Sequence, residues 1–319
     1  MRALVWGIGG LAVVWCLYWL VGSVVISHSV EDWLNRPQAV MIDRQDVSVA
    51  GFPNRFDLTV TAPVVTDPAT GITWQAPFVQ VFAMTWKPWH LIAALPTGQT
   101  ITLPDQVVTI TSDQLRGSLQ VTPDSDMALQ SVVVETTNLA LTSTLGTALQ
   151  LDRAVLSTAM DSTRRNSHRL GLQVTNLTPP ATELPLSLHL DAYLLLSAPL
   201  DRHAATTRPQ LTGIELADLT LDWGDMNLNG AGSVAATSDG TAQGVVNLRI
   251  RNWRQLPDLL AVIGIVKPEI APTLLRALEL LAEDSPDPDL LELPLTFQNG
   301  RTSLGVLPIG PAPIIAYRQ

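Results

Sequence analysis

Strict alternation of apolar and polar side chains is the feature that most constrains how this chain can fold. The longest run has an aliphatic residue at every second position, at Leu186, Leu188, Leu190, Ala192, Leu194 and Leu196. Successive side chains of a strand point to opposite faces, so this run predicts a strand with one apolar face and one face that meets water. Residues 57–64, 117–122, 170–174, 226–229 and 246–251 repeat the pattern. Together they predict a mainly β chain of antiparallel strands.

Turn residues separate these runs. Proline-containing segments at residues 68–71, 123–126 and 179–180 lie between alternating stretches, where proline, glycine and aspartate favour turns. Ser238-Asp239-Gly240 is predicted to form the tip of a hairpin. Asn299-Gly300 lies between two apolar runs and is a strong hairpin signal.

Helical periodicity is concentrated in an insert at about residues 255–283. Residues 256–266 and 270–282 are predicted to form a pair of helices separated by Lys267-Pro268. In the second helix, four leucines form an apolar stripe, at Leu274, Leu275, Leu278 and Leu281. A shorter helix of about two turns is predicted at residues 88–95.

One apolar run precedes the strands. Residues 3–26 are 24 consecutive positions without a charged side chain, and a helix of that length extends about 36 Å, enough to cross a hydrocarbon core of about 30 Å. We therefore expect residues 1–26 to form a transmembrane anchor and residues 27–319 to form a β-rich domain. A cleaved signal peptide is the alternative, although Val21-Gly22-Ser23 is a poor match to its cleavage site.

The charges beside this run predict its orientation. Arg2 precedes the run, whereas Glu31 and Asp32 follow it. The positive-inside rule then places the N-terminus in the cytoplasm. In a bacterium, this gives a single-pass inner-membrane protein with a periplasmic body. The only cysteine, Cys16, lies inside the run, so the exported body contains neither a thiol nor a disulfide.

The charge balance narrows the range of partners. The chain has 19 Lys and Arg against 29 Asp and Glu, for a net charge of −10. Nucleic acid is excluded as a partner because phosphate binding needs a basic surface. Charged residues make up 15% of the chain, against roughly 25% in a typical soluble protein. The polar strand faces use Thr, Ser, Asn and Gln instead.

Strands with one apolar face can be arranged in two ways. Two sheets can pack face to face as a sandwich, or one long curved sheet can enclose an apolar groove that the helical pair closes at one end. Both alternatives fit the sequence. If the groove forms, we expect the large aliphatic side chains of the alternating strands to line it. The predicted lining residues are Leu186, Leu188, Leu190, Val246 and Leu248.

Four segments carry a resemblance to a known family. They are GFPNRFDL at residues 51–58, WKPWHLIA at 86–93, LTLDWG at 219–224 and LPLTFQNG at 293–300. By these segments the chain resembles a proteobacterial envelope family defined as a domain of unknown function. The resemblance covers nearly the whole chain after the anchor and implies an inner-membrane anchor with a periplasmic domain. More distantly, the chain is similar to AsmA-like proteins, which implies an elongated β-groove that shields lipid in transit between membranes.

Residues with catalytic or metal-binding chemistry are scattered. The chain has five histidines, His28, His90, His168, His189 and His203. They form neither an H-E-x-x-H motif nor a close pair. His189 and Asp191 share the polar face of one strand, where we expect surface positions and not a catalytic dyad. The acidic segment 283–289 contains two prolines and is interpreted as a solvated linker. We therefore expect no enzyme activity, no cofactor and no metal.

The only basic cluster is at residues 164–169. We interpret it as a solvated hairpin tip, with an anionic lipid headgroup as the alternative partner. The sequence as a whole predicts a non-enzymatic periplasmic protein that binds or shields phospholipid or another apolar ligand in envelope maintenance. The alternative is a structural or adaptor protein that presents its polar sheet face to an envelope protein partner.

Overall fold

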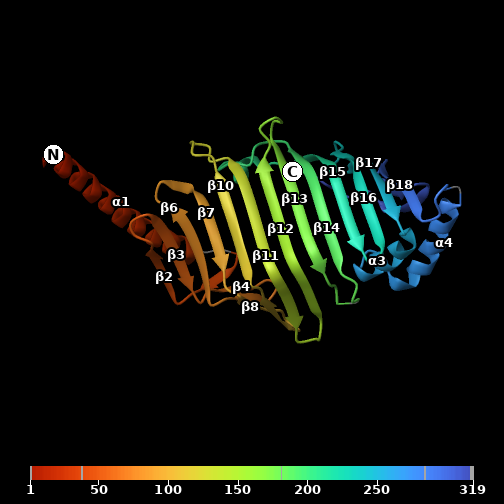
Figure 1. Ribbon diagram of the computed structural model, residues 1–319, viewed down its shortest axis with the longest axis horizontal. Helices are drawn as coiled ribbons and strands as arrows, with labels where there is room; N and C mark the ends of the chain where they lie inside the picture. Colours follow the sequence, from red (N-terminus) through yellow and green to blue (C-terminus); the bar gives the residue numbers. More distant parts are fainter. Residues whose placement is uncertain (1, 37–38, 181, 284, 317–319) are drawn as a thin grey trace. The chain divides into compact units, whose positions relative to one another are not determined.

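The computed structural model describes residues 2–36, 39–180, 182–283 and 285–316. The fold is mainly β: one long open antiparallel sheet, an N-terminal apolar helix and C-terminal helices (Figure 1). This confirms the predicted fold class. The chain divides into two compact units. Unit 1 is Met1–Val121 with Val134–Thr147, and unit 2 is Thr122–Val133 with Ala148–Gln319.

Unit 1 holds one helix and two series of paired strands. Its elements are α1 (Arg2–Asn35), β1 (Met41–Asp43), β2 (Asp46–Ala50), β3 (Arg55–Thr61), β4 (Val64–Asp67), β5 (Ile72–Gln75), β6 (Phe78–Met84), β7 (Lys87–Leu95), β8 (Gly98–Thr102), β9 (Val107–Thr111) and β10 (Gln114–Val121). The C-terminal part of β11 (Leu129–Ser143) also lies in this unit. One series runs β2-β3-β6-β7-β10. The other runs β1-β4-β5-β8-β9-β11.

The helix predicted at residues 88–95 is wrong, because this segment forms β7. Its residues pair with β6 on one side and β10 on the other, with Leu91 opposite both Ala83 and Leu119. Trp89, Leu91, Ala93 and Leu95 also alternate with a period of two. The two neighbouring strands supply partners for the backbone, so pairing decided between the two periods that this short segment allows.

Unit 2 contains a series of long strands and the C-terminal helices. Its elements are β12 (Ala148–Met160), β13 (Ser167–Leu177), β14 (Leu186–Leu196), α2 (Ala204–Thr207), β15 (Leu211–Trp223), β16 (Met226–Ala236), β17 (Ala242–Arg251), α3 (Leu256–Val262), α4 (Ala271–Ala282), β18 (Leu290–Gln298), β19 (Arg301–Leu304) and β20 (Leu307–Pro311). Short 3-10 turns precede α3 at Trp253–Gln255 and α4 at Pro268–Ile270. From β12 to β20 each strand pairs antiparallel with the next.

Both predicted hairpins are present in unit 2. Asn299 and Gly300 join β18 to β19 with φ angles of 52° and 71°, and Gln298 pairs with Arg301 across them. These left-handed conformations match the twist of the strands in a two-residue hairpin. Ser238-Asp239-Gly240 lies between β16 and β17, where the Thr237 N–H donates to the Thr241 carbonyl.

The predicted helical pair is confirmed as α3 and α4, which supply the main core of unit 2. Figure 1 shows them beside the ends of β16, β17 and β18. Twelve buried side chains form this core: Leu186, Trp223, Met226, Leu228, Ile250, Trp253, Leu256, Leu259, Leu278, Leu291, Leu293 and Leu304. Leu278 of α4 is fully buried, and Leu274, Leu275 and Leu281 pack against the core, as the apolar stripe predicts.

Helix α1 is longer than the predicted anchor and continues to Asn35. Among the described residues it is the one helix long and apolar enough to cross a membrane. Most of its apolar side chains are exposed in the isolated protein, including Leu4, Trp6 and Leu11. Trp19 is the buried residue of α1, and its ring stacks with Phe56 of β3.

Candidate functional site

One side of the unit 2 sheet is apolar from strand to strand. Its central row crosses six strands through Leu172, Leu190, Leu219, Gly230, Leu248 and Leu293, each paired with the next. The next row towards the β12–β13 hairpin crosses Leu170, Ala192, Leu216, Gly232, Val246 and Leu295. We call this surface the apolar face, together with Leu156 and Met160 of β12, which pair with Leu172 and His168. Cross-strand pairing places all of these side chains on one side, and an irregularity in β15 keeps Leu216 and Leu219, three residues apart, on the same face.

Burial along the central row of the apolar face decreases from Leu293, which is 9% exposed, towards Leu156 of β12, although Ala192 in the next row is buried. Ile250 and Leu291 lie beside the helices, with 0% and 3% of their surfaces exposed. Leu172, Leu190 and Leu219 are half-buried. Leu156 and Met160 are 45% and 42% exposed. The same face is therefore a filled core at one end and an apolar surface that meets solvent at the other.

The structure brings all five predicted lining residues to the apolar face. Leu186 belongs to the filled core, and Leu188 and Leu248 pack against it. Val246 is buried, whereas Leu190 is half-buried. That these side chains contact a ligand stays a prediction. Their positions divide them into residues that fill the core and residues, such as Leu190, that continue onto the open part of the face.

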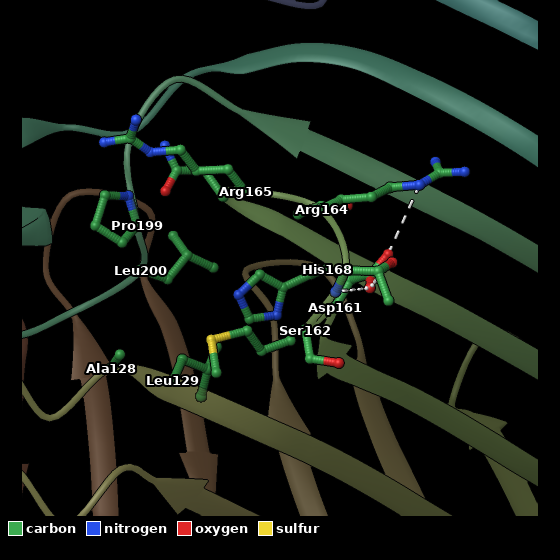
Figure 2. Close-up of a pocket in the computed structure, with 13 residues that line it drawn as sticks. Ala128, Leu129, Asp161, Ser162, Arg164, Arg165, His168, Pro199 and Leu200 are labelled. Carbon is green, nitrogen blue, oxygen red and sulfur yellow. Dashed lines mark hydrogen bonds and ion pairs between the residues drawn. The ribbon is translucent and has the colours of Figure 1, made fainter.

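A hollow of about 410 Å³ lies at the β12–β13 hairpin, next to the open part of the apolar face. Three separate parts of unit 2 line it: Ala128 and Leu129, residues 160–168, and Pro199 with Leu200. Figure 2 shows the His168 imidazole in the middle of these side chains, facing Leu129 and Leu200. The hollow thus combines an apolar wall with a polar hairpin.

Two polar side chains of the hollow are buried. His168 is 4% exposed, and burial lowers its pKa below the ordinary value of 6.5, so the imidazole is neutral near pH 7. Its Nδ1 lies 3.5 Å from the Thr158 hydroxyl. Ser167 is fully buried, and its hydroxyl has no hydrogen-bond partner among the described residues.

The two arginines of the hairpin differ. The Arg164 guanidinium bonds to Glu215, forms an ion pair with Asp161 and lies 4.3 Å from the centre of the Tyr193 ring. In Figure 2 it points away from the hollow towards Asp161, while Arg165 lies at the rim beside Pro199. Arg165 has no ion-pair partner in the part of the chain that the structure describes. It is therefore the cation of this hairpin that is available to an anion.

Sequence reasoning found the basic cluster but missed the hollow. The cluster at residues 164–169 is visible as a run of charges, whereas the wall comes from residues 128–129 and 199–200. The Leu129 N–H donates to the Leu200 carbonyl and so joins these two distant segments. No local sequence pattern predicts that pairing.

The opposite face of the unit 2 sheet carries paired charges. Arg169 donates two hydrogen bonds to Asp191, at 2.8 and 2.6 Å, and these bonds lower the pKa of Asp191. His189 is on the same face of β14, two residues before Asp191, and lies 3.8 Å from Asp218. The two side chains therefore have different partners. The described residues contain no group of three His, Cys, Asp or Glu side chains placed to hold a metal ion.

By its fold the protein is a mainly β protein with an open antiparallel sheet, one apolar sheet face and a candidate membrane helix. The comparison with protein families identifies the family. Residues 19–313 match the family described as "Uncharacterized protein conserved in bacteria (DUF2125)", and the chain belongs to this family. The match extends from within α1 through β20 and thus covers both units. Neither the comparison with curated proteins nor the comparison with solved structures found a match.

Proposed function

We propose that this protein is a single-pass inner-membrane protein whose periplasmic β-sheet binds the acyl chains of phospholipid and shields them from water during envelope maintenance. It acts by binding and catalyses no reaction. The observation that carries the proposal is the open part of the apolar face, where leucines aligned across strands remain half-buried beside the exposed Leu156 and Met160. A contiguous exposed apolar surface marks a binding site.

The hollow supports an amphipathic ligand. An acyl chain would lie along the aliphatic rows, and the phosphate would lie at the β12–β13 hairpin. There the Arg165 guanidinium is the available cation. Charge-assisted hydrogen bonds from arginine to phosphate are strong and directional.

The similarity to AsmA-like proteins is part of this proposal. That similarity implies an apolar β-groove, and an open antiparallel sheet with one apolar face is the architecture such a groove needs. The low aromatic content of the chain, 5%, leaves the face to Leu, Val and Ala, whose uniform aliphatic surface suits acyl chains. The candidate membrane helix supports a location next to a lipid source.

The test is lipid copurification with the full-length chain. The full chain is needed because Trp19 of α1 covers Phe56 of β3. The protein is purified in a detergent that contains no phosphate, and bound lipid is extracted and identified by mass spectrometry. We expect phospholipid in a stoichiometric amount. Leu156→Glu places a charge on the open part of the apolar face, so we expect it to remove most of that lipid while the circular dichroism spectrum is retained.

The matched control is Gln173→Glu. Gln173 lies on the neighbouring strand and pairs with Val155, so its side chain is on the opposite face. The control adds the same charge change and is expected to retain the lipid. Protein without phospholipid, or equal lipid in both variants, would contradict the proposal. If crosslinking in cells instead captures one stoichiometric protein partner and the purified protein holds no lipid, the adaptor function replaces it.

A further inference from the structure

Two turns of unit 1 meet the side of α1. The first is Gly51–Arg55, between β2 and β3, and the second is Thr85-Trp86, between β6 and β7. They are bonded to each other, because both the N–H and the hydroxyl of Thr85 donate to the Asn54 carbonyl at 3.1 Å. We call these two turns together the aromatic tip.

Side chains of α1 donate hydrogen bonds to three carbonyl groups of the aromatic tip. Trp15 Nε1 donates to Pro53 at 3.0 Å, the Tyr18 hydroxyl to Thr85 at 3.0 Å, and Trp19 Nε1 to Arg55 at 2.6 Å. The rings also pack, since Trp19 lies edge-on to Phe52 and stacks with Phe56. The helix therefore donates to backbone carbonyl groups at this end of β3 and in the two turns.

Gly22 allows this close approach. A Cβ atom at position 22 would lie 2.7 Å from Cζ of Phe56, so a larger residue would displace the Phe56 ring or the helix. Gly7, Gly9 and Gly10 have nothing within 4 Å of the same position. The part of α1 that contacts the aromatic tip and Phe56 thus extends from Trp15 to Gly22, and near the end of the helix Asn35 accepts a hydrogen bond from Arg44.

This contact surface lies within the length of helix that a membrane requires. From Ala3 to Trp15 the helix rises about 18 Å, whereas a hydrocarbon core is about 30 Å thick and takes about 20 residues. A span that begins at Ala3 therefore ends near Gly22. Trp15 and Trp19 then lie about 5–10 Å below the boundary on the side of the β-body.

The surface of the aromatic tip suits that depth. Phe52 and Trp86 are 54% and 56% exposed, although both lie beside an apolar helix. Buried in lipid, an unpaired backbone carbonyl would cost several kcal/mol, and the three donors of α1 remove that cost here. Arg55 is the exposed charge of the tip, and its guanidinium bonds to Asp57 at 2.7 Å, a position suited to the level of the lipid phosphates.

We propose that the aromatic tip inserts into the leaflet on the side of the β-body, with Phe52 and Trp86 in contact with acyl chains. This inference rests on the proposed membrane anchor and adds a second point of contact with the bilayer. The occupant is the lipid of the bilayer itself. Tryptophan rings favour the headgroup level of a bilayer, and amphipathic elements at a membrane surface are buried about 5–10 Å into the headgroup and acyl boundary.

The experiment places a fluorescent probe at the tip of the full-length protein. In a Cys16→Ser background, Phe52→Cys and Trp86→Cys are each labelled with the environment-sensitive dye NBD and reconstituted into phosphatidylethanolamine and phosphatidylglycerol vesicles. The control is Asp105→Cys, at an exposed turn between β8 and β9. We expect probes at 52 and 86 to show blue-shifted emission, quenching by phospholipid spin-labelled near the top of the acyl chain, and loss of quenching by iodide. The probe at 105 is expected to show the opposite.

Alkaline carbonate extraction of the same vesicles separates the possible failures. If the protein resists extraction and the probes at 52 and 86 behave like the probe at 105, the tip proposal is overturned and the anchor proposal is retained. If the protein is extracted, α1 is not a membrane anchor, and both the anchor in the proposed function and the tip proposal are overturned. The difference in bound lipid between Leu156→Glu and Gln173→Glu reports on the apolar face of unit 2 and is independent of both outcomes.

Discussion

Unit 1 and unit 2 share the same alternation of apolar and polar side chains but bury it to different extents. In unit 2, α3 and α4 cover one end of the apolar face and enclose twelve buried apolar side chains. In the described part of unit 1, the large buried apolar side chains are Trp19 and Phe56, where α1 meets β3. Strand residues such as Leu58, Val60 and Val81 remain half-buried.

The difference shows what a covering helix contributes. A one-sided strand pattern specifies an apolar face, but that face becomes a core only where another element packs on it. In unit 2 this element is the amphipathic pair near the C-terminus. In unit 1 it is a helix with the composition of a membrane span, which packs through three aromatic side chains and Gly22.

The largest expected effect breaks the core that the helices make in unit 2. Leu278→Ala removes a fully buried side chain of α4 and should cost about 2–5 kcal/mol of unfolding free energy, because it leaves a cavity. Leu280→Ala is the control on the same helix, where the leucine is 68% exposed, and should change stability by no more than about 0.5 kcal/mol. Urea titration followed by circular dichroism measures both. Equal effects would mean that α4 does not cover the sheet.

The second prediction tests the covering helix of unit 1. Gly22→Leu forces a side chain against Phe56 and should weaken the contact between α1 and β3 by about 1–3 kcal/mol, the usual cost of overpacking. Hydrogen exchange of the β3 amides should become faster. Gly10→Leu has open space around it and should leave exchange unchanged. Protection of β3 that survives Gly22→Leu would contradict the docking of α1.

The smallest expected effect concerns pH and the hollow of unit 2. Burial lowers the pKa of His168 in the folded protein, whereas the unfolded chain has the ordinary pKa of about 6.5. The contribution of His168 to stability is therefore fully present above pH 6.5 and is lost as pH falls towards the lower, folded pKa, since the unfolded state then binds more protons.

His168→Gln removes this titration. Stability of the wild type should fall more steeply than that of the variant between about pH 7.5 and 5, as measured by urea titration at each pH. An unchanged slope in His168→Gln would show that the ring is not buried in the folded protein.

Much of the fold follows from local sequence. The alternation in β14, the Asn299-Gly300 hairpin and the leucine stripe of α4 each depend on side-chain spacing along one segment. The helix predicted at residues 88–95 is wrong because Trp89, Leu91 and Leu95 also fit a strand. Long-range pairing with β6 and β10 decided between them.

The candidate site was less accessible to sequence reasoning. Leu186 and Leu190 belong to one alternating run and have similar side chains, yet one lies in the core and the other on the open part of the face. The hollow unites residues 128–129, 160–168 and 199–200. Such contacts depend on the path of the chain, which local patterns do not contain.

The sequence by itself determined which side chains share a face, where the chain turns and which helix can cross a membrane, because these properties depend on spacing and composition along one segment. Only the tertiary structure decided where the apolar face is covered, where it stays open, and how the aromatic tip meets α1. These outcomes depend on which distant elements come together, since an apolar face has the same pattern whether a helix, a ligand or lipid covers it.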